Sequence, residues 1–192
     1  NTEINTLYGS GGVNGLGDAN IIITNDLTVE EANEIDLLTT DVVTATIVSS
    51  ETVETLKTLT GVNEYSITIN AVDATSTTAA DLNAINALTT AVVDASAVTG
   101  LFPDTIANIK TLLTAGNDTS QFTDTSFANL TSVSVFNATE YLENYADLRD
   151  AFGFDLDAAT DHYARSGRSE GRIDGTKDVT DLNEVIALAN TA

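Results

Sequence analysis

Three residue types are missing from this chain of 192 residues, which contains no cysteine, no methionine and no tryptophan. Without cysteine there can be no disulfide, zinc–thiolate site or thiol nucleophile, a composition compatible with a secreted bacterial protein. Basic residues are scarce, because seven lysines and arginines stand against 29 acidic residues, for a formal net charge of −22. Nucleic-acid binding requires clustered lysine and arginine, so we exclude that class of partner. An anionic membrane surface would also repel the chain.

Long apolar runs are absent as well. No stretch of about 18 apolar residues is present, so we predict no membrane insertion. Hydrophobic residues nevertheless make up 42% of the chain, enough for a globular core. The sequence starts at Asn1 without methionine or a signal peptide. We therefore expect a processed chain or an excised piece whose export signal lies elsewhere.

Five segments alternate apolar and polar residues as short strands do. They are residues 19–24, 41–50, 64–69, 90–95 and 131–136. In DVVTATIVSS (41–50), Val43, Ala45 and Ile47 share one face of a strand, and Thr44 and Thr46 share the other. The first four strand centres, Ile22, Ala45, Ile67 and Val93, are spaced by 23, 22 and 26 residues. Spacing in the low twenties indicates a repeat array.

Helix signals occupy the segments between the strands, at residues 28–38, 50–61, 78–88 and 103–113. Thr28 and Glu31 stand in capping-box register, Ser50 and Pro103 are expected to start two further helices, and Gly61 is expected to stop one. We predict an α/β fold, a helix–strand solenoid with a short parallel sheet. It is similar to a leucine-rich repeat in size but lacks that repeat's asparagine pattern. A small helical hairpin is expected to follow it.

The chain divides by composition into three parts. We assign residues 1–136 to the solenoid repeats, 137–175 to a helical hairpin module, and 176–192 to the start of a further repeat or a terminal helix. Five of the seven basic residues and three of the five tyrosines lie in 137–177. The pattern [TA]-[DE]-[IL]-N recurs at 2–5, 80–83 and 180–183, so we expect a segment cut from a longer array or built to join others end to end.

The hairpin, expected as one helix before Gly153 and a second before Gly167, carries a specific motif. Residues 141–172 resemble a bacterial module of the form YLxxxPDL…A…DxxxAxxHYxxxGxxEGR, with Ala146 where proline is usual. The matching positions are Tyr141, Leu142, Asp147, Leu148, Ala158, His162, Tyr163, Gly167, Glu170, Gly171 and Arg172. That module occurs in large secreted or surface proteins of aquatic bacteria, often beside calcium-binding RTX repeats. Residues 1–136 are similar to Thr- and Ala-rich repeats of the same proteins, and together the resemblances imply an extracellular structural or adhesive protein.

A hydroxyl-bearing sheet face is the first candidate contact surface. We expect one side of the sheet to carry Thr44, Thr46, Ser66, Thr68, Ser132 and Ser134. Rows of threonine on a flat solenoid can contact glycans, ice or another surface. The alternative interpretation is an ordinary solvated β-face.

Acidic clusters suggest calcium, because hard cations prefer carboxylate oxygens. The candidate ligands are Asp155, Asp157, Asp161, Asp174, Asp178 and Asp181. The spacing lacks the glycine and distal glutamate of an EF-hand, so helix capping by Asp155 and a solvated acidic face are the alternatives. No cofactor is required, and calcium is the one candidate. GSGGVNGLGD (9–18) has no GK[ST] ending and is interpreted as a connection rather than a phosphate loop.

Catalytic residues are not expected. Residues 167–171 fit GxSxG, but a nucleophile elbow follows a strand, whereas Ser169 follows a predicted helix. The sole histidine, His162, is expected to pack in the hairpin. We therefore predict a non-enzymatic, extracellular structural or adhesive segment that associates with itself end to end at a bacterial surface. Calcium is expected to favour this association. A glycan- or surface-binding module and a viral fibre or decoration protein are the alternatives.

Overall fold

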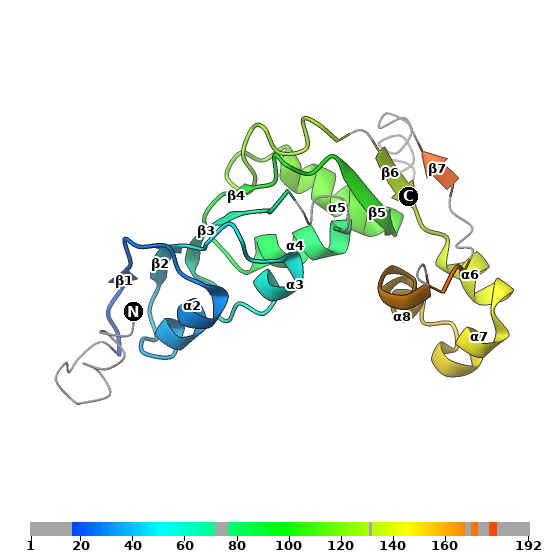
Figure 1. The fold of residues 1–192 in the computed structure, drawn as a ribbon, viewed down its shortest axis with the longest axis horizontal. Helices are drawn as coiled ribbons and strands as arrows, with labels where there is room; N and C mark the ends of the chain where they lie inside the picture. Colours follow the sequence, from blue (N-terminus) through cyan, green and yellow to red (C-terminus); the bar gives the residue numbers. More distant parts are fainter. Residues whose placement is uncertain (1–16, 72–76, 131, 168–169, 173–176, 180–192) are drawn as a thin grey trace.

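The first sheet of the protein is parallel and lies beside a row of helices (Figure 1). The computed structural model describes residues 17–71, 77–130, 132–167, 170–172 and 177–179. Its first sheet has the order β1-β2-β3-β4. These strands are β1 (Ile21–Ile22), β2 (Val43–Thr46), β3 (Glu64–Thr68) and β4 (Val93–Asp94). Between them run α2 (Val29–Asp36), α3 (Val53–Leu56) and α4 (Ala79–Ala87), confirming a mixed α/β chain with a short parallel sheet.

Successive strands pair at short, similar separations in sequence. Ile21 pairs with Val43, Thr44 with Glu64, and Ile67 with Val93. The alternation predicted for β2 is confirmed, because Val43, Ala45 and Ile47 are all buried. They join a continuous hydrophobic cluster that extends from Ile21 to Val133 and includes the inward residues of α2, α3 and α4. Each helix–strand unit therefore shares its core with the next.

Buried polar side chains connect one helix–strand unit to the next. Asn63 is 2% exposed, and its Oδ1 accepts a hydrogen bond of 2.8 Å from the Val43 amide. The hydroxyl of Thr89 accepts from the Tyr65 amide at 2.9 Å and donates to the Tyr65 carbonyl at 2.7 Å. The hydroxyl of Thr39 likewise donates to the Ala19 carbonyl. These bonds satisfy backbone groups that would otherwise be buried without partners.

Helices α2 and α4 begin in the same way. Thr28 and Thr78 are N-caps, and each forms a capping box with the acidic residue three positions later, as predicted for Thr28 and Glu31. The fifth residue of each helix, Asn33 or Asn83, then donates to a carbonyl 25 residues further on. Helices α2 and α4 thus share one local design, whereas α3 between them has a threonine N-cap without a capping box.

Two predicted helix starts are wrong. Helix α3 begins after Thr52 rather than Ser50, because the Thr52 side chain accepts from the Thr55 amide. Helix α5 (Ile106–Gly116) begins after Thr105 rather than at Pro103. Pro103 instead lies in strand β5 (Gly100–Asp104), at a register shift between Leu101 and Asp104. A strand tolerates proline at such an irregularity because no ladder donor is needed there.

The segment predicted at 131–136 belongs to a second sheet. Strand β6 (Ser132–Val135) pairs in parallel with β5 and antiparallel with β7 (Lys177–Val179). It is therefore not the next strand of the first sheet. The register of this second sheet joins residues that are more than 30 positions apart, whereas strands of the first sheet join residues 20 to 26 apart.

The predicted hairpin has three helices rather than two. They are α6 (Ala138–Asn144), α7 (Ala146–Phe152) and α8 (Leu156–His162), and α8 continues into a π-helical turn, Tyr163–Gly167. Tyr145 is extended and divides α6 from α7. A proline at position 146 would favour such a break, because the residue before proline avoids helical backbone angles. Ala146 retains the break without the proline, with the Arg149 side chain donating to the Leu142 and Glu143 carbonyls.

Replacement of Asn63 by alanine tests the connection between units. Asn63→Ala leaves the buried Val43 amide without its acceptor, so we expect a loss of about 2 kcal/mol in the free energy of unfolding. Urea denaturation followed by circular dichroism measures it. The control is Asn144→Ala at an exposed site in α6, expected to change stability by less than about 0.5 kcal/mol. Equal effects of the two variants would refute a structural role for the Asn63 bond.

Candidate functional site

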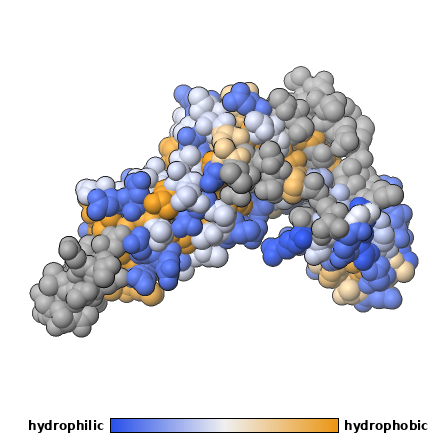
Figure 2. Space-filling view, viewed as in Figure 1, coloured by the Kyte–Doolittle hydropathy of each residue, from blue (hydrophilic) through white to orange (hydrophobic). Residues whose placement is uncertain are grey.

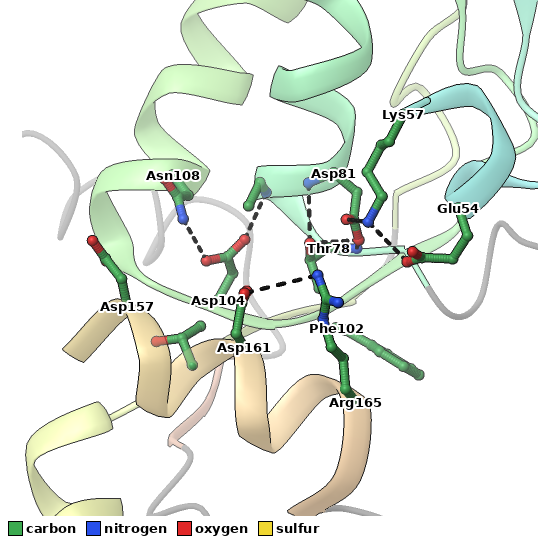
Figure 3. Close-up of a pocket in the computed structure, with 12 residues that line it drawn as sticks. Glu54, Lys57, Thr78, Asp81, Phe102, Asp104, Asn108, Asp157, Asp161 and Arg165 are labelled. Carbon is green, nitrogen blue, oxygen red and sulfur yellow. Dashed lines mark hydrogen bonds and ion pairs between the residues drawn. The ribbon is translucent and has the colours of Figure 1, made fainter. Parts of the chain in front are cut away.

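A cavity of about 310 Å³ lies where the hairpin meets the helices of the first sheet. Figure 2 shows the surface hollowed between these two parts of the molecule. Its lining combines carboxylates, two cations, amide and hydroxyl groups and one aromatic ring. The lining residues are Glu54, Lys57, Thr78, Ala80, Asp81, Phe102, Asp104, Asn108, Asp157, Thr160, Asp161 and Arg165. Figure 3 shows most of these side chains converging from α3, α4, α5 and α8.

An ion pair forms one wall of the cavity. Lys57 Nζ lies 2.5 Å from Asp81 Oδ1 and 2.8 Å from Glu54 Oε1, and it thereby joins α3 to α4. Burial raises the pKa of Asp81, but hydrogen bonds from Lys57 and Thr78 outweigh it, and the net pKa lies below the usual value. The pKa of Lys57 is correspondingly raised, because its bonds to Asp81 and Glu54 outweigh the effect of burial. The pair is therefore ionised at neutral pH.

Asp104 forms the base of the cavity and is fully buried. Its Oδ2 accepts from the Ala80 amide at 2.7 Å, and its Oδ1 accepts from the Thr105 amide and from Asn108 Nδ2. Burial raises the pKa of Asp104, although these three hydrogen bonds oppose the effect. The carboxylate thus fixes the start of α4 to the start of α5 and orients the Asn108 amide.

The opposite wall belongs to α8. Asp161 on α8 and Arg165 on the π-helical turn that follows it point toward the first part of the molecule (Figure 3). Arg165 is 3.8 Å from Asp161, and both side chains are more than half exposed, so this ion pair is weak. Asp157 has no hydrogen-bond partner among the described residues. Asp157 and the weakly paired Asp161 and Arg165 are therefore available to a ligand, whereas the Thr160 hydroxyl already donates to the Leu156 carbonyl.

Calcium ligation receives no geometric support from the described part of the chain. Asp155 caps α8 by accepting from the Ala158 amide, which was the alternative interpretation. Asp157 and Asp161 line the cavity, and Asp178 lies on β7, whereas Asp174 and Asp181 fall outside the described residues. Among the described residues, no group of three or more acidic or histidine side chains is arranged to hold a metal ion.

The hydroxyl-bearing face is shorter than the six predicted residues suggest. Thr46 pairs with Ser66, and both are exposed together with Thr68, while Thr44 is half-buried and donates to Glu64 Oε2. These four residues share one face of β2 and β3. Ser132 and Ser134 lie on β6 in the other sheet, so the six residues do not form one row.

The residues of the module motif contact one another. Arg172 donates to both carboxylate oxygens of Asp147, at 3.1 and 2.8 Å, and to Glu170, while its guanidinium lies 4.7 Å from the centre of the Tyr145 ring. The hydrogen bond from Arg172 lowers the pKa of Asp147. Gly171 has a φ of +71°, a conformation that favours glycine and completes this turn. The motif thus fixes the end of the hairpin to α7.

Tyr141 occupies the centre of the hairpin. It is fully buried, its hydroxyl is 3.1 Å from His162 Nδ1, and burial raises its pKa to about 12. Phe136, Tyr145 and Tyr163 pack around its ring. A Cβ at Gly167 would overlap the Tyr141 hydroxyl. These contacts place His162 in a packed cluster, and Ser169 lies outside the described residues.

Sequence and structure comparisons add no assignment. A scan of protein-family models, a search of curated proteins and a search of solved structures found no match to this chain. Within the described residues, no helix is both long and apolar enough to cross a membrane.

Removing the cation of the Lys57 pair should reduce stability in a pH-dependent way. The pKa of Asp81 is lowered in the folded chain, so its contribution is complete above its ordinary pKa of about 4 and is lost as pH falls through the folded value. We expect Lys57→Met to cost about 2 kcal/mol at pH 7 and clearly less at pH 3. Urea denaturation at both values measures this difference. The control Lys110→Met, at an exposed site on α5, changes net charge equally, and a matching loss in both variants would contradict the prediction.

Gly167 tests the packing around Tyr141. Because an added Cβ would overlap the Tyr141 hydroxyl, Gly167→Ala should destabilise the hairpin by about 1–3 kcal/mol. Near-ultraviolet circular dichroism reports on it, since three of the five tyrosines lie there. Gly17→Ala, where a Cβ meets nothing within 4 Å, is the control. Unchanged tyrosine signal and stability in Gly167→Ala would refute this packing.

Proposed function

We propose that the chain is a non-enzymatic, extracellular structural segment built as an α/β solenoid. The observation that carries this proposal is a set of hydrogen bonds, each between a side chain and a backbone group 20 to 25 residues away in the sequence. Solenoid proteins depend on such contacts between neighbouring repeats, because no repeat buries its hydrophobic face alone. The hydrophobic core that extends from Ile21 to Val133 also makes each unit depend on its neighbours. Both features favour a stiff structural element.

The hairpin supports a structural role. Arg172 donates to both Asp147 and Glu170, and the Tyr141 hydroxyl is hydrogen-bonded to His162 inside an aromatic cluster. These motif residues are therefore engaged in internal contacts of the hairpin. The module resembled by this segment is associated with secreted and surface proteins, which is the basis for proposing an extracellular location.

One edge of the first sheet offers a route to association between chains. In the described part of the chain, β1 pairs with β2 alone. The amides of Ile21 and Ile23 donate to β2, so alternation along the strand directs the Ile22 amide to the other edge. Ile22 is 72% exposed. An unpaired strand edge is a template for strand addition from a second chain.

Charge makes this association dependent on salt. A net charge of −22 keeps separate chains apart at low ionic strength. At about 1 M salt the Debye length falls to about 3 Å, and the repulsion is largely screened. We propose that high salt, or millimolar calcium, allows end-to-end joining. Pairing through β1 alone gives two-chain assemblies, and longer filaments need a second joint.

Replacement of Ile22 by proline tests end-to-end joining. Ile22→Pro removes the donor at the open edge and retains the bonds to β2, whereas Ile22→Thr keeps that donor. Light scattering and electron microscopy should show single chains at low salt. At high salt or with calcium, the unaltered chain and Ile22→Thr should form oligomers and Ile22→Pro should stay monomeric. A monomer under every condition, or assembly by Ile22→Pro, would refute joining through β1.

A second candidate function is contact with a glycan or another surface through the sheet face. The alignment of Thr46 with Ser66, and the exposure of both with Thr68, favours it. Thr46→Lys with Thr68→Lys would disrupt a flat hydroxyl surface without altering the buried side of either strand. Unchanged binding of that double variant to a glycan array would remove this candidate.

A further inference from the structure

We propose that the cavity between α8 and the starts of α4 and α5 binds a neutral sugar. This site is separate from the sheet face and from the β1 edge. Each sugar hydroxyl both donates and accepts a hydrogen bond, so a sugar site requires acceptors and donors close together. The cavity supplies both kinds of group, and its volume of about 310 Å³ is at the lower end of the range for small-molecule sites.

Both walls of the cavity supply polar groups. Asp157 and Asp161 on α8 offer carboxylate oxygens, and Arg165 beside them offers guanidinium N–H groups. Across the cavity, Asn108 Nδ2 is held by Asp104, and its Oδ1 accepts no bond from the described residues. Phe102 adds an aromatic ring that suits the C–H face of a sugar. Figure 3 shows Asp161 and Arg165 directed from the α8 side toward the starts of α4 and α5, with Phe102 extending to one side.

The base of the cavity is preorganised. Asp104 holds Ala80, Thr105 and Asn108 with three hydrogen bonds, and Lys57 is fixed between Glu54 and Asp81. A ligand therefore has little to order on this side, which lowers the entropic cost of binding. The α8 wall, with its weak Arg165–Asp161 pair, can adjust to the ligand.

The composition of the lining argues against other ligand classes. Five carboxylates against two cationic side chains repel phosphate, sulfate and acidic sugars. The described residues form no group that could hold a metal ion. An apolar ligand would remove water from Asp157 and from the weak Arg165–Asp161 pair without replacing its hydrogen bonds, at a cost in affinity. A cationic amine would meet Arg165 and Lys57, whereas a neutral polyhydroxylated ligand can use both signs of charge.

Binding is tested with the methyl glycosides of glucose, galactose and mannose, using saturation-transfer NMR and calorimetry. We expect at least one glycoside to bind the full chain equally at 0.05 M and 0.5 M NaCl. Asp161→Asn and Arg165→Met should each weaken binding about tenfold or more, because each removes a charge-assisted hydrogen bond. Asp150→Asn, at an exposed site on α7, makes the same chemical change outside the cavity and should have no effect.

Three results would overturn the proposal. The first is that none of the three glycosides binds. The second is binding that Asp161→Asn and Arg165→Met leave intact, or that Thr46→Lys with Thr68→Lys abolishes, which would move the site to the sheet face. The third is binding of spermidine alone, lost at 0.5 M NaCl, which would identify a cation site. The experiment on the β1 edge measures oligomerisation, not glycoside binding. Failure of the sugar-binding proposal is therefore distinguishable from failure of the proposal that chains join through β1.

Discussion

The hydrogen bond from a buried side chain to the backbone of the neighbouring helix–strand unit is the interaction on which the first part of this protein depends. A strand of two to five residues, as found in the first sheet, has few ladder bonds of its own. Asn63 and Thr89 add bonds to backbone groups beside those ladders, and Glu51 and Asp104 do so at the starts of α2 and α4. The units are consequently held in register at both their strand and helix sides.

The hairpin achieves order by another route. Its helices pack around Tyr141 in a hydrophobic cluster, from Phe136 to Tyr163, that is separate from the core of the first sheet. Arg172 adds two hydrogen bonds to the Asp147 carboxylate. Because α8 faces the N-terminal ends of α4 and α5, two acidic surfaces meet and leave polar groups around a cavity. The cavity therefore follows from the way the two parts meet, and neither part contains it alone.

Local patterns predicted much of this structure from sequence. The inward residues of β2 and the capping box of Thr28 and Glu31 involve neighbours within a few positions. The short parallel sheet was predicted as well, but the pairings of the second sheet were missed. Pro103 suggested a helix start because nothing local reveals that Gly100–Asp104 pairs with β6, and Ser132 and Ser134 were assigned to the wrong sheet for the same reason. The cavity was missed too, although Lys57, the only basic residue before Lys110, was an available signal.

Residue-resolved hydrogen exchange tests the central claim most directly. The amides of Val43 and Tyr65 donate to side chains of the following unit, rather than to another strand's carbonyl. If those bonds hold the units together, both amides should exchange as slowly as that of Ile69, which bonds to the Asp94 carbonyl across the sheet. Exchange of Val43 and Tyr65 at the rate of exposed loop amides, while Ile69 remains protected, would contradict the account.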